Sequence, residues 1–147
     1  MSRMPSRLRY PMLFALYFGV FFVLDFTPYI QRHIVSHWTD FLATLSGMLL
    51  TLIHSHVIVV KNTIIDDATQ VGVTILAGCN AVEACGLLLA AMMSFPARWK
   101  DRLIGGIYGV LTVQVVNIAR IISLFFLAEW NQWMFDFAHR YLWQALI

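Results

Sequence analysis

Three long apolar segments alternate with shorter polar ones along the chain. They cover about residues 11–30, 77–96 and 103–129. Each is close to the roughly 20 residues that a helix needs to cross the hydrocarbon core of a bilayer, so the pattern predicts three membrane-spanning helices. The first follows Arg3, Arg7 and Arg9, as in a signal peptide, but no small-x-small cleavage pattern comes after it. We therefore expect a retained span.

Residues 38–55 show a different period. Large apolar side chains recur at steps of three and four residues with polar or small ones opposite, which indicates an amphipathic helix. The apolar positions are Trp38, Phe41, Leu42, Leu45, Leu49, Leu52 and Ile53. Because one face is polar, we expect this helix to lie at the membrane interface or to pack over the other helices. The alternative is a second span inside a bundle, which would reverse the orientation of everything downstream.

Residues 57–76 are rich in β-branched side chains, interrupted by polar clusters at residues 61–62 and 66–70. This composition predicts two short strands joined by a polar turn. Open strand edges do not survive in lipid, so we expect this hairpin in the aqueous layer, leading directly into Cys79.

Together these segments predict an all-α polytopic membrane protein. We expect a small helical bundle in one membrane-embedded domain, residues 1–147, with an amphipathic interfacial helix and a short extracytoplasmic β-hairpin. A partial last helix is expected from about residue 138.

The composition agrees with a membrane protein. Of the 147 residues, 60% are hydrophobic and 12% charged, whereas soluble domains are about half apolar and a quarter charged. The formal charge of +2 is dispersed along the chain, which argues against a nucleic-acid-binding face, because such a face needs clustered basic residues. The two cysteines, Cys79 and Cys85, make neither a disulfide framework nor a paired Cys/His metal motif.

The basic residues predict the orientation. Lys and Arg concentrate in cytoplasmic loops, and the connector at residues 97–102 is the most basic in the chain. If this connector and the amino-terminal arginines lie inside, Cys79 and the end of the third span lie outside. An even number of crossings, including zero, must then fall between residues 29 and 75, so that residues 38–55 are not a single span.

Cys79 and Arg120 are expected at the same depth. Cys79 lies 17 positions before Pro96 and Arg120 lies 17 positions after Leu103, so both stand roughly 25 Å above the connector. Glu83 on one helix and Asn117 on the next continue polar stripes that should face each other.

These residue types suit peptide chemistry. Thiolate is the nucleophilic form of cysteine, and a nearby guanidinium favours it and can also stabilise an oxyanion. His139 follows a stretch expected outside, residues 129–138, and can fold back toward the same face. Its imidazole can take the thiol proton and return it to a leaving amine. We predict a membrane cysteine peptidase or transpeptidase.

Other interpretations stay open. Cys79 alone would say little, and Cys85 is expected to be a small buried hydrophobe. Arg120 can instead snorkel to the interface or neutralise Glu83, which would fit a non-enzymatic membrane assembly or scaffold protein. A small transporter is a weaker alternative, because the chain has no inverted repeat.

The remaining histidines are not expected to bind metal. His54 and His56 lie two apart at a helix-to-strand transition, but no carboxylate or cysteine stands close in sequence, which favours interfacial polar residues over ligands. His33 and His37 have i, i+4 spacing without the glutamate and third ligand of a metallopeptidase motif.

The order and spacing of these residues resemble the exosortase/archaeosortase group. The resemblance covers about residues 70–139 and rests on Gly78-Cys79-Asn80, the basic turn, Asn117-x-x-Arg120 and His139. The short length and the run from Cys79 to Ala84 look most like exosortase H. Many members have glycine where this chain has Ala81. Only 8 residues follow His139, where relatives usually continue into a membrane helix, so we expect a truncated or minimal form.

The resemblance implies a cysteine endopeptidase or transpeptidase in a bacterial cytoplasmic membrane, with its active site on the extracytoplasmic face. Substrates would be membrane-tethered exported proteins with a tripartite, PEP-CTERM-like sorting signal: a short motif, a transmembrane helix and a basic tail. For exosortase H the motif is of the Ile-Pro-Thr-Leu-x-x-Trp kind. Cleavage would pass through a thioester that water or an amine acceptor resolves.

The resemblance also assigns roles to residues. The family's catalytic cysteine, arginine and histidine carry over to Cys79, Arg120 and His139, with Asn80, Glu83 and Asn117 as supporting residues. It implies no metal and no organic cofactor, and the dispersed charge argues against a nucleic-acid partner.

Overall fold

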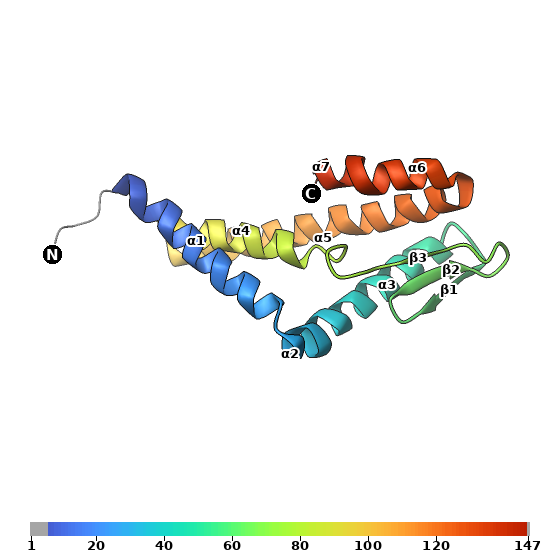
Figure 1. Cartoon of the computed structure of the whole chain (residues 1–147), viewed down its shortest axis with the longest axis horizontal. Helices are drawn as coiled ribbons and strands as arrows, with labels where there is room; N and C mark the ends of the chain where they lie inside the picture. Colours follow the sequence, from blue (N-terminus) through green and yellow to red (C-terminus); the bar gives the residue numbers. More distant parts are fainter. Residues whose placement is uncertain (1–5, 147) are drawn as a thin grey trace.

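The structure is a computed structural model that describes residues 6–146 and is mostly helical, with one small sheet (Figure 1). The helices are α1 (Ser6–Asp25), α2 (Pro28–Ile30), α3 (Ser36–Thr51), α4 (Val82–Ser94), α5 (Trp99–Trp130), α6 (Gln132–Phe137) and α7 (Trp143–Leu146). The strands are β1 (Val57–Val60), β2 (Thr63–Asp66) and β3 (Gly72–Thr74), and two π-helical segments are η1 (Gln31–Val35) and η2 (Ala138–Leu142). Arg3, one of the three amino-terminal arginines, lies outside the described residues.

Three helices form what we call the stem: α1, α4 and residues 99–119 of α5 (Figure 1). Helix α1 packs on α4, which packs on α5. The contact between α1 and α4 is close at the buried Gly86, because the ring of Phe21 occupies the space that a side chain there would need. Helices α1 and α5 are long and apolar enough to cross a membrane, whereas the apolar α4 has only 13 residues.

The helix bounds differ from those expected. Helix α1 ends at Asp25 instead of near residue 30, because Thr27 is held extended (ψ 126°) by the proline that follows it. The span expected over residues 77–96 is helical only from Val82 to Ser94, because a turn occupies residues 77–81. Helix α5 is longer than expected and begins at Trp99.

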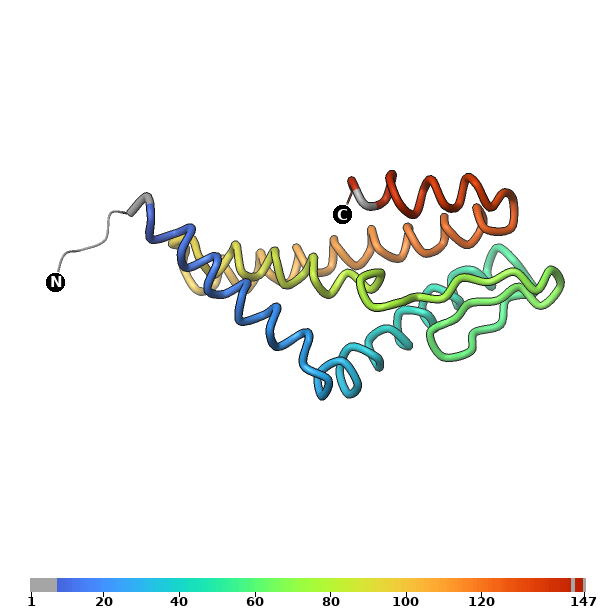
Figure 2. The backbone as a smooth tube through the Cα atoms, viewed as in Figure 1, coloured from blue at the N-terminus to red at the C-terminus, as the bar shows by residue number. Residues whose placement is uncertain are grey.

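A second part of the molecule forms what we call the cap: residues 36–75 and 120–146. With 32 residues, α5 is about 48 Å long, more than the roughly 30 Å of a hydrocarbon core, and it continues into the cap. Helix α3 packs against α5 and the sheet, and α6 returns along α5. Figure 2 shows the backbone entering the cap through α3 and returning through the sheet to the start of α4.

Helix α3 turns a different face to the core from the one its large apolar residues suggested. Phe41, Leu49 and Leu52 are exposed, whereas Leu42, Ala43, Ser46, Gly47 and Leu50 are buried. Smaller side chains allow close packing here, since a side chain at Gly47 would collide with Val59 of β1. Phe41 and Leu49 therefore remain on the surface of the molecule, opposite the core.

The expected two-stranded hairpin is a three-stranded antiparallel sheet in the order β1-β2-β3. Its middle row pairs Val59 with Ile64 and Ile64 with Val73. This row packs with α3 and α5 into a core that includes Leu50, Ile121 and Phe125. The prediction of one polar turn was wrong because residues 61–62 and residues 67–69 each form a turn.

Candidate active site

A turn at residues 77–81 carries Cys79 at the junction of stem and cap. Gly78 (φ 86°) and Ala81 (φ 58°) both have the left-handed backbone conformation. The N–H of Cys79 donates to the carbonyl of Leu76 at 2.9 Å. The chain therefore reverses sharply around Cys79 before α4 begins, and the thiol remains half-buried.

Asn80 fixes this turn to three helices. Its side chain is buried, with Nδ2 donating to Thr39 Oγ1 on α3 at 3.1 Å and Oδ1 accepting from the N–H of Val82 at 3.1 Å. Its backbone carbonyl accepts from Gln114 Nε2 on α5 at 3.5 Å. An acceptor at the first N–H of α4 satisfies a donor that has no partner inside the helix. Asn80 thus holds the turn against α3, α4 and α5.

Arg120 lies beside Cys79. Its side chain is only 5% exposed, and Nη2 lies 3.8 Å from Cys79 Sγ, within hydrogen-bonding range of a sulfur. Its Nε is buried and has no hydrogen-bond partner among residues 6–146. The described ion pairs do not join Glu83 to Arg120, so the structural pair of the scaffold interpretation is not formed. A buried cation therefore has a thiol as its side-chain partner.

His139 reaches the same place by a chain reversal. Asn131 Oδ1 accepts from the N–H groups of Trp133 and Met134, at 2.8 and 3.4 Å, and caps α6 as the chain turns back. The last helical segment thus begins at Gln132, earlier than the expected residue 138. His139, on η2, lines a cavity of about 200 Å³ together with Cys79 and Arg120.

The environment of His139 favours its neutral form. Burial, and then the positive charges of Arg120 and Arg140, lower the pKa of His139. Its ring stacks on Phe135 with centroids 5.7 Å apart, and its buried Nδ1 has no hydrogen-bond partner within the described part of the chain. A neutral imidazole can accept a proton.

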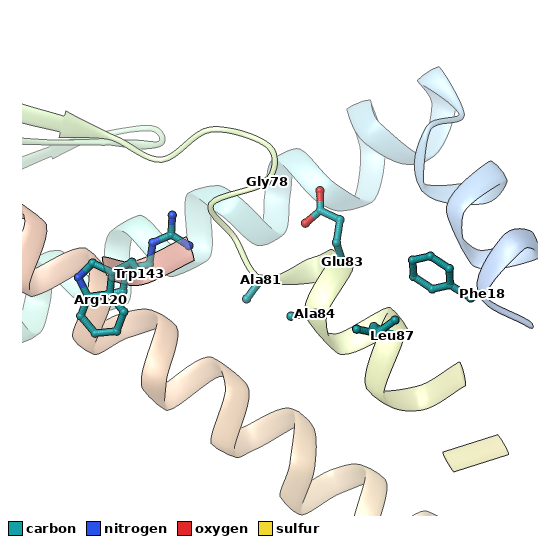
Figure 3. A pocket seen from close by; sticks show the side chains of 8 residues that line it. All are labelled: Phe18, Gly78, Ala81, Glu83, Ala84, Leu87, Arg120 and Trp143. Carbon is teal, nitrogen blue, oxygen red and sulfur yellow. The ribbon is translucent and has the colours of Figure 1, made fainter. Parts of the chain in front are cut away.

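Arg120 also borders a second cavity, of about 370 Å³ (Figure 3). Arg120 and Trp143 lie on one side, Glu83, Leu87 and Phe18 lie on the other, and the turn with Gly78 passes over it. Since α1, α4, α5 and α7 all contribute, this cavity lies between the stem and the returning segment. It gives an extended ligand a place to lie next to the guanidinium.

The other predicted polar residues occupy distinct positions. Asn117 is fully buried one turn before Arg120, and neither its Oδ1 nor its Nδ2 meets a described partner. Cys85 lies in α4, with its sulfur 3.4 Å from Gln114 Nε2. Thr39 and Trp143 were not predicted, because sequence gives no sign that α3 and α7 pack beside the turn. Side chains able to hold a metal ion gather elsewhere, at His54, Asp66 and Glu129.

Comparison with known proteins yields one family. A family model described as transmembrane exosortase matches residues 5–142, nearly the whole chain. No curated protein and no solved structure matches.

Proposed function

The chain belongs to the transmembrane exosortase family, and from this premise we propose that it is a membrane cysteine endopeptidase or transpeptidase acting on carboxy-terminal sorting signals. Cys79 is the nucleophile, Arg120 its electrostatic partner and His139 the proton carrier. Asn80, Glu83 and Asn117 support them.

One observation carries this proposal: the buried Arg120 lies 3.8 Å from Cys79 Sγ and has no carboxylate partner among the described ion pairs. A buried cation without a counter-ion is costly, so its position beside a thiol points to a function. A thiolate would supply the missing negative charge. The same guanidinium can then stabilise the oxyanion that forms when a carbonyl is attacked.

The steps follow from these positions. His139 takes the thiol proton, and the sulfur of Cys79 forms a bond to the scissile carbonyl carbon, whose oxygen becomes negative beside Arg120. As the C–N bond breaks, the protonated imidazole gives its proton to the leaving amine. A thioester joins the amino-terminal part of the substrate to Cys79. Water or an amine acceptor then attacks this thioester and frees the thiol.

The family and the distribution of charge support our proposals for the substrate and for its side of the membrane. The basic connector at residues 97–102 supports a cytoplasmic α4–α5 turn, and we therefore propose that Cys79 acts on the extracytoplasmic face of a bacterial cytoplasmic membrane. Proteins delivered there with a tripartite signal, of the Ile-Pro-Thr-Leu-x-x-Trp kind as in exosortase H, would present their motif just outside the bilayer. The cavity between Glu83 and Arg120 is the site that we assign to that motif.

The two cysteines provide a matched test. In membranes that contain a reporter protein ending in such a signal, Cys79→Ala should abolish processing, whereas Cys85→Ala should leave it within about twofold. Both variants should show the circular dichroism of the unchanged protein. Processing by the Cys79→Ala variant at the normal rate would refute the assigned nucleophile.

A further inference from the structure

Three ionisable side chains from distant parts of the chain meet at the outer end of the cap. His54 follows α3, Asp66 ends β2, and Glu129 lies in the last turn of α5. His54 Nε2 lies 2.8 Å from Asp66 Oδ2 and 3.7 Å from Glu129 Oε1. One ligand atom from each lies within 4.8 Å of the other two. We call these residues the cap triad.

Asp66 has an unusual position for a carboxylate. It pairs with Val57 across the sheet, its side chain is only 2% exposed, and it points inward like Ile64 two residues before it. The N–H of Ala68 donates to Oδ1 at 2.7 Å, which leaves Oδ2 directed at His54. A buried carboxylate requires positive charge or hydrogen bonds around it.

The imidazole of His54 is also fixed in orientation. The rings of Phe125 and Phe126 lie edge-on to it, with centroids 6.1 and 6.3 Å away. Its pKa is raised, first by the hydrogen bond to Asp66, and the same bond lowers the pKa of Asp66. Protons therefore compete with any other cation for these atoms.

Glu129 brings a second carboxylate to the same nitrogen. Its Oε1 is shielded from solvent and has no hydrogen-bond partner within residues 6–146. Two carboxylates that converge in a partly buried place repel each other unless a proton, a protonated imidazole or a metal ion lies between them. A neutral imidazole with two carboxylates carries a charge of about −2, which a divalent ion neutralises.

We propose that His54 Nε2, Asp66 Oδ2 and Glu129 Oε1 form a binding site for a divalent transition-metal ion of the zinc class. One nitrogen and two carboxylate oxygens are ligands that zinc accepts, with a water at the fourth position. Tetrahedral coordination with bonds of about 2.0 Å separates ligand atoms by roughly 3.3 Å. The 2.8 and 3.7 Å separations lie on either side of that value.

This site goes beyond the peptidase chemistry and would act on the cap as a whole. It joins the ends of α3, β2 and α5 just before Asn131, where the chain reverses toward His139. An ion that binds only the folded state stabilises it. Bound metal therefore holds together the elements that place His139.

The test uses the full-length protein without a polyhistidine tag, purified in detergent. It carries Cys79→Ala, which removes the thiol that would otherwise bind metal beside His139. Titration with zinc should show one ion per chain and raise the melting temperature by about 5 °C at saturation. Cobalt should give the d–d absorption of a tetrahedral nitrogen and oxygen site, without charge transfer from a thiolate.

Variants locate the ion. His54→Ala and the isosteric Glu129→Gln should each weaken zinc binding at least tenfold and abolish the zinc-dependent rise in melting temperature. His56→Ala is the matched control, since this exposed histidine lies only two residues away, and should change neither. A Cys79→Ala protein that binds no zinc at 100-fold molar excess would overturn the proposal. Unchanged binding in both His54→Ala and Glu129→Gln would do the same, and would leave the triad as hydrogen-bonded side chains only.

Discussion

Arg120 is a cation at a position where burial makes a charge costly. Its side chain lies beside the thiol of Cys79 and borders both cavities of the candidate site. A lysine would keep the charge, but it would lose the planar fork of donors that can contact a sulfur and an oxyanion together. At the scale of single residues, the proposal therefore depends on this guanidinium as much as on the nucleophile.

The pH dependence of substrate processing should follow the protonation state of His139. Burial and Arg120 lower the pKa of this imidazole, so it is neutral at pH 7 and gains a proton only below its ordinary value of about 6.5. A protonated imidazole cannot accept the thiol proton, so kcat/KM should fall as pH drops through that lowered pKa. Rates measured between pH 4.5 and 8 check this.

A comparison variant sharpens this pH test. Arg120→Met removes a positive charge that disfavours protonation of His139, so the acid limb of its residual activity should move to higher pH. His139→Ala should lose the limb altogether. An acid limb that stays in the His139→Ala variant would assign the titration to another group.

The contact between Cys79 and Arg120 was predicted from sequence, because both residues follow from one short connector between adjacent antiparallel segments. The equal offsets of 17 residues assumed continuous helix, whereas α4 begins only at Val82 and α5 begins at Trp99, so the non-helical residues 77–81 complete the distance to Arg120. The bond between Asn80 and Thr39 joins residues 41 positions apart and depends on how α3 packs. The cap triad was not predicted for the same reason, because Asp66 and Glu129 come near His54 only in the folded chain.

The turn before α4 is the element whose geometry most constrains the site. Ala81 is buried and has φ 58°, a conformation that costs an alanine about 1 kcal/mol and that a β-branched residue hardly adopts. Glycine adopts it without strain. The glycine that many family members have at this position is therefore explained by backbone geometry.

Substitutions at Ala81 should separate strain from side-chain chemistry. Ala81→Val should lower the free energy of unfolding by about 2 kcal/mol or more, through backbone strain and overpacking, and should slow processing because the turn moves Cys79. Ala81→Gly should keep processing within about threefold. Thermal melts and reporter assays measure both effects. Normal stability of the Val variant would contradict the left-handed turn.

For the other elements, the sequence predicted helix or strand correctly more often than it predicted the residues at which each element begins and ends. The apolar segments became helices because their period is strong, but the turn at residues 77–81 and the proline at 28 fix ends that hydropathy does not show. Strands were predicted at the right place in the sequence, but two were expected where the structure has three. The third strand, β3, was missed because it has only three residues and contains Gly72. Strand β3 packs on α5, which is far away in the sequence, so this contact could not be predicted from local pattern.

At the scale of the whole molecule, we assign the stem to the membrane and the cap to its extracytoplasmic side. After α1, residues 30–38 line a cavity with α1, α4 and α5, and the chain then continues through α3 and the sheet in the cap before it returns to Cys79 (Figure 1). This arrangement supports zero crossings between residues 29 and 75, as the distribution of basic residues requires.

Single cysteines introduced into the inactive Cys79→Ala, Cys85→Ala protein test this topology. Thr69→Cys, in the exposed β2–β3 turn, should react with a membrane-impermeant thiol reagent on cells whose cytoplasmic membrane is intact. Lys100→Cys, at the exposed start of α5, should react only after that membrane is permeabilised. Labelling in the reverse pattern would show that the cap faces the cytoplasm.

The most direct test of the central claim is to look for the covalent intermediate on Cys79. Purified enzyme mixed with a sorting-signal substrate and quenched early should contain, by mass spectrometry, the amino-terminal part of the substrate attached to the peptide that carries Cys79. Hydroxylamine should release it, as expected of a thioester, and the Cys85→Ala enzyme should form the same adduct. Cleavage of the substrate by the Cys79→Ala enzyme, with no adduct on the unaltered protein, would contradict the account.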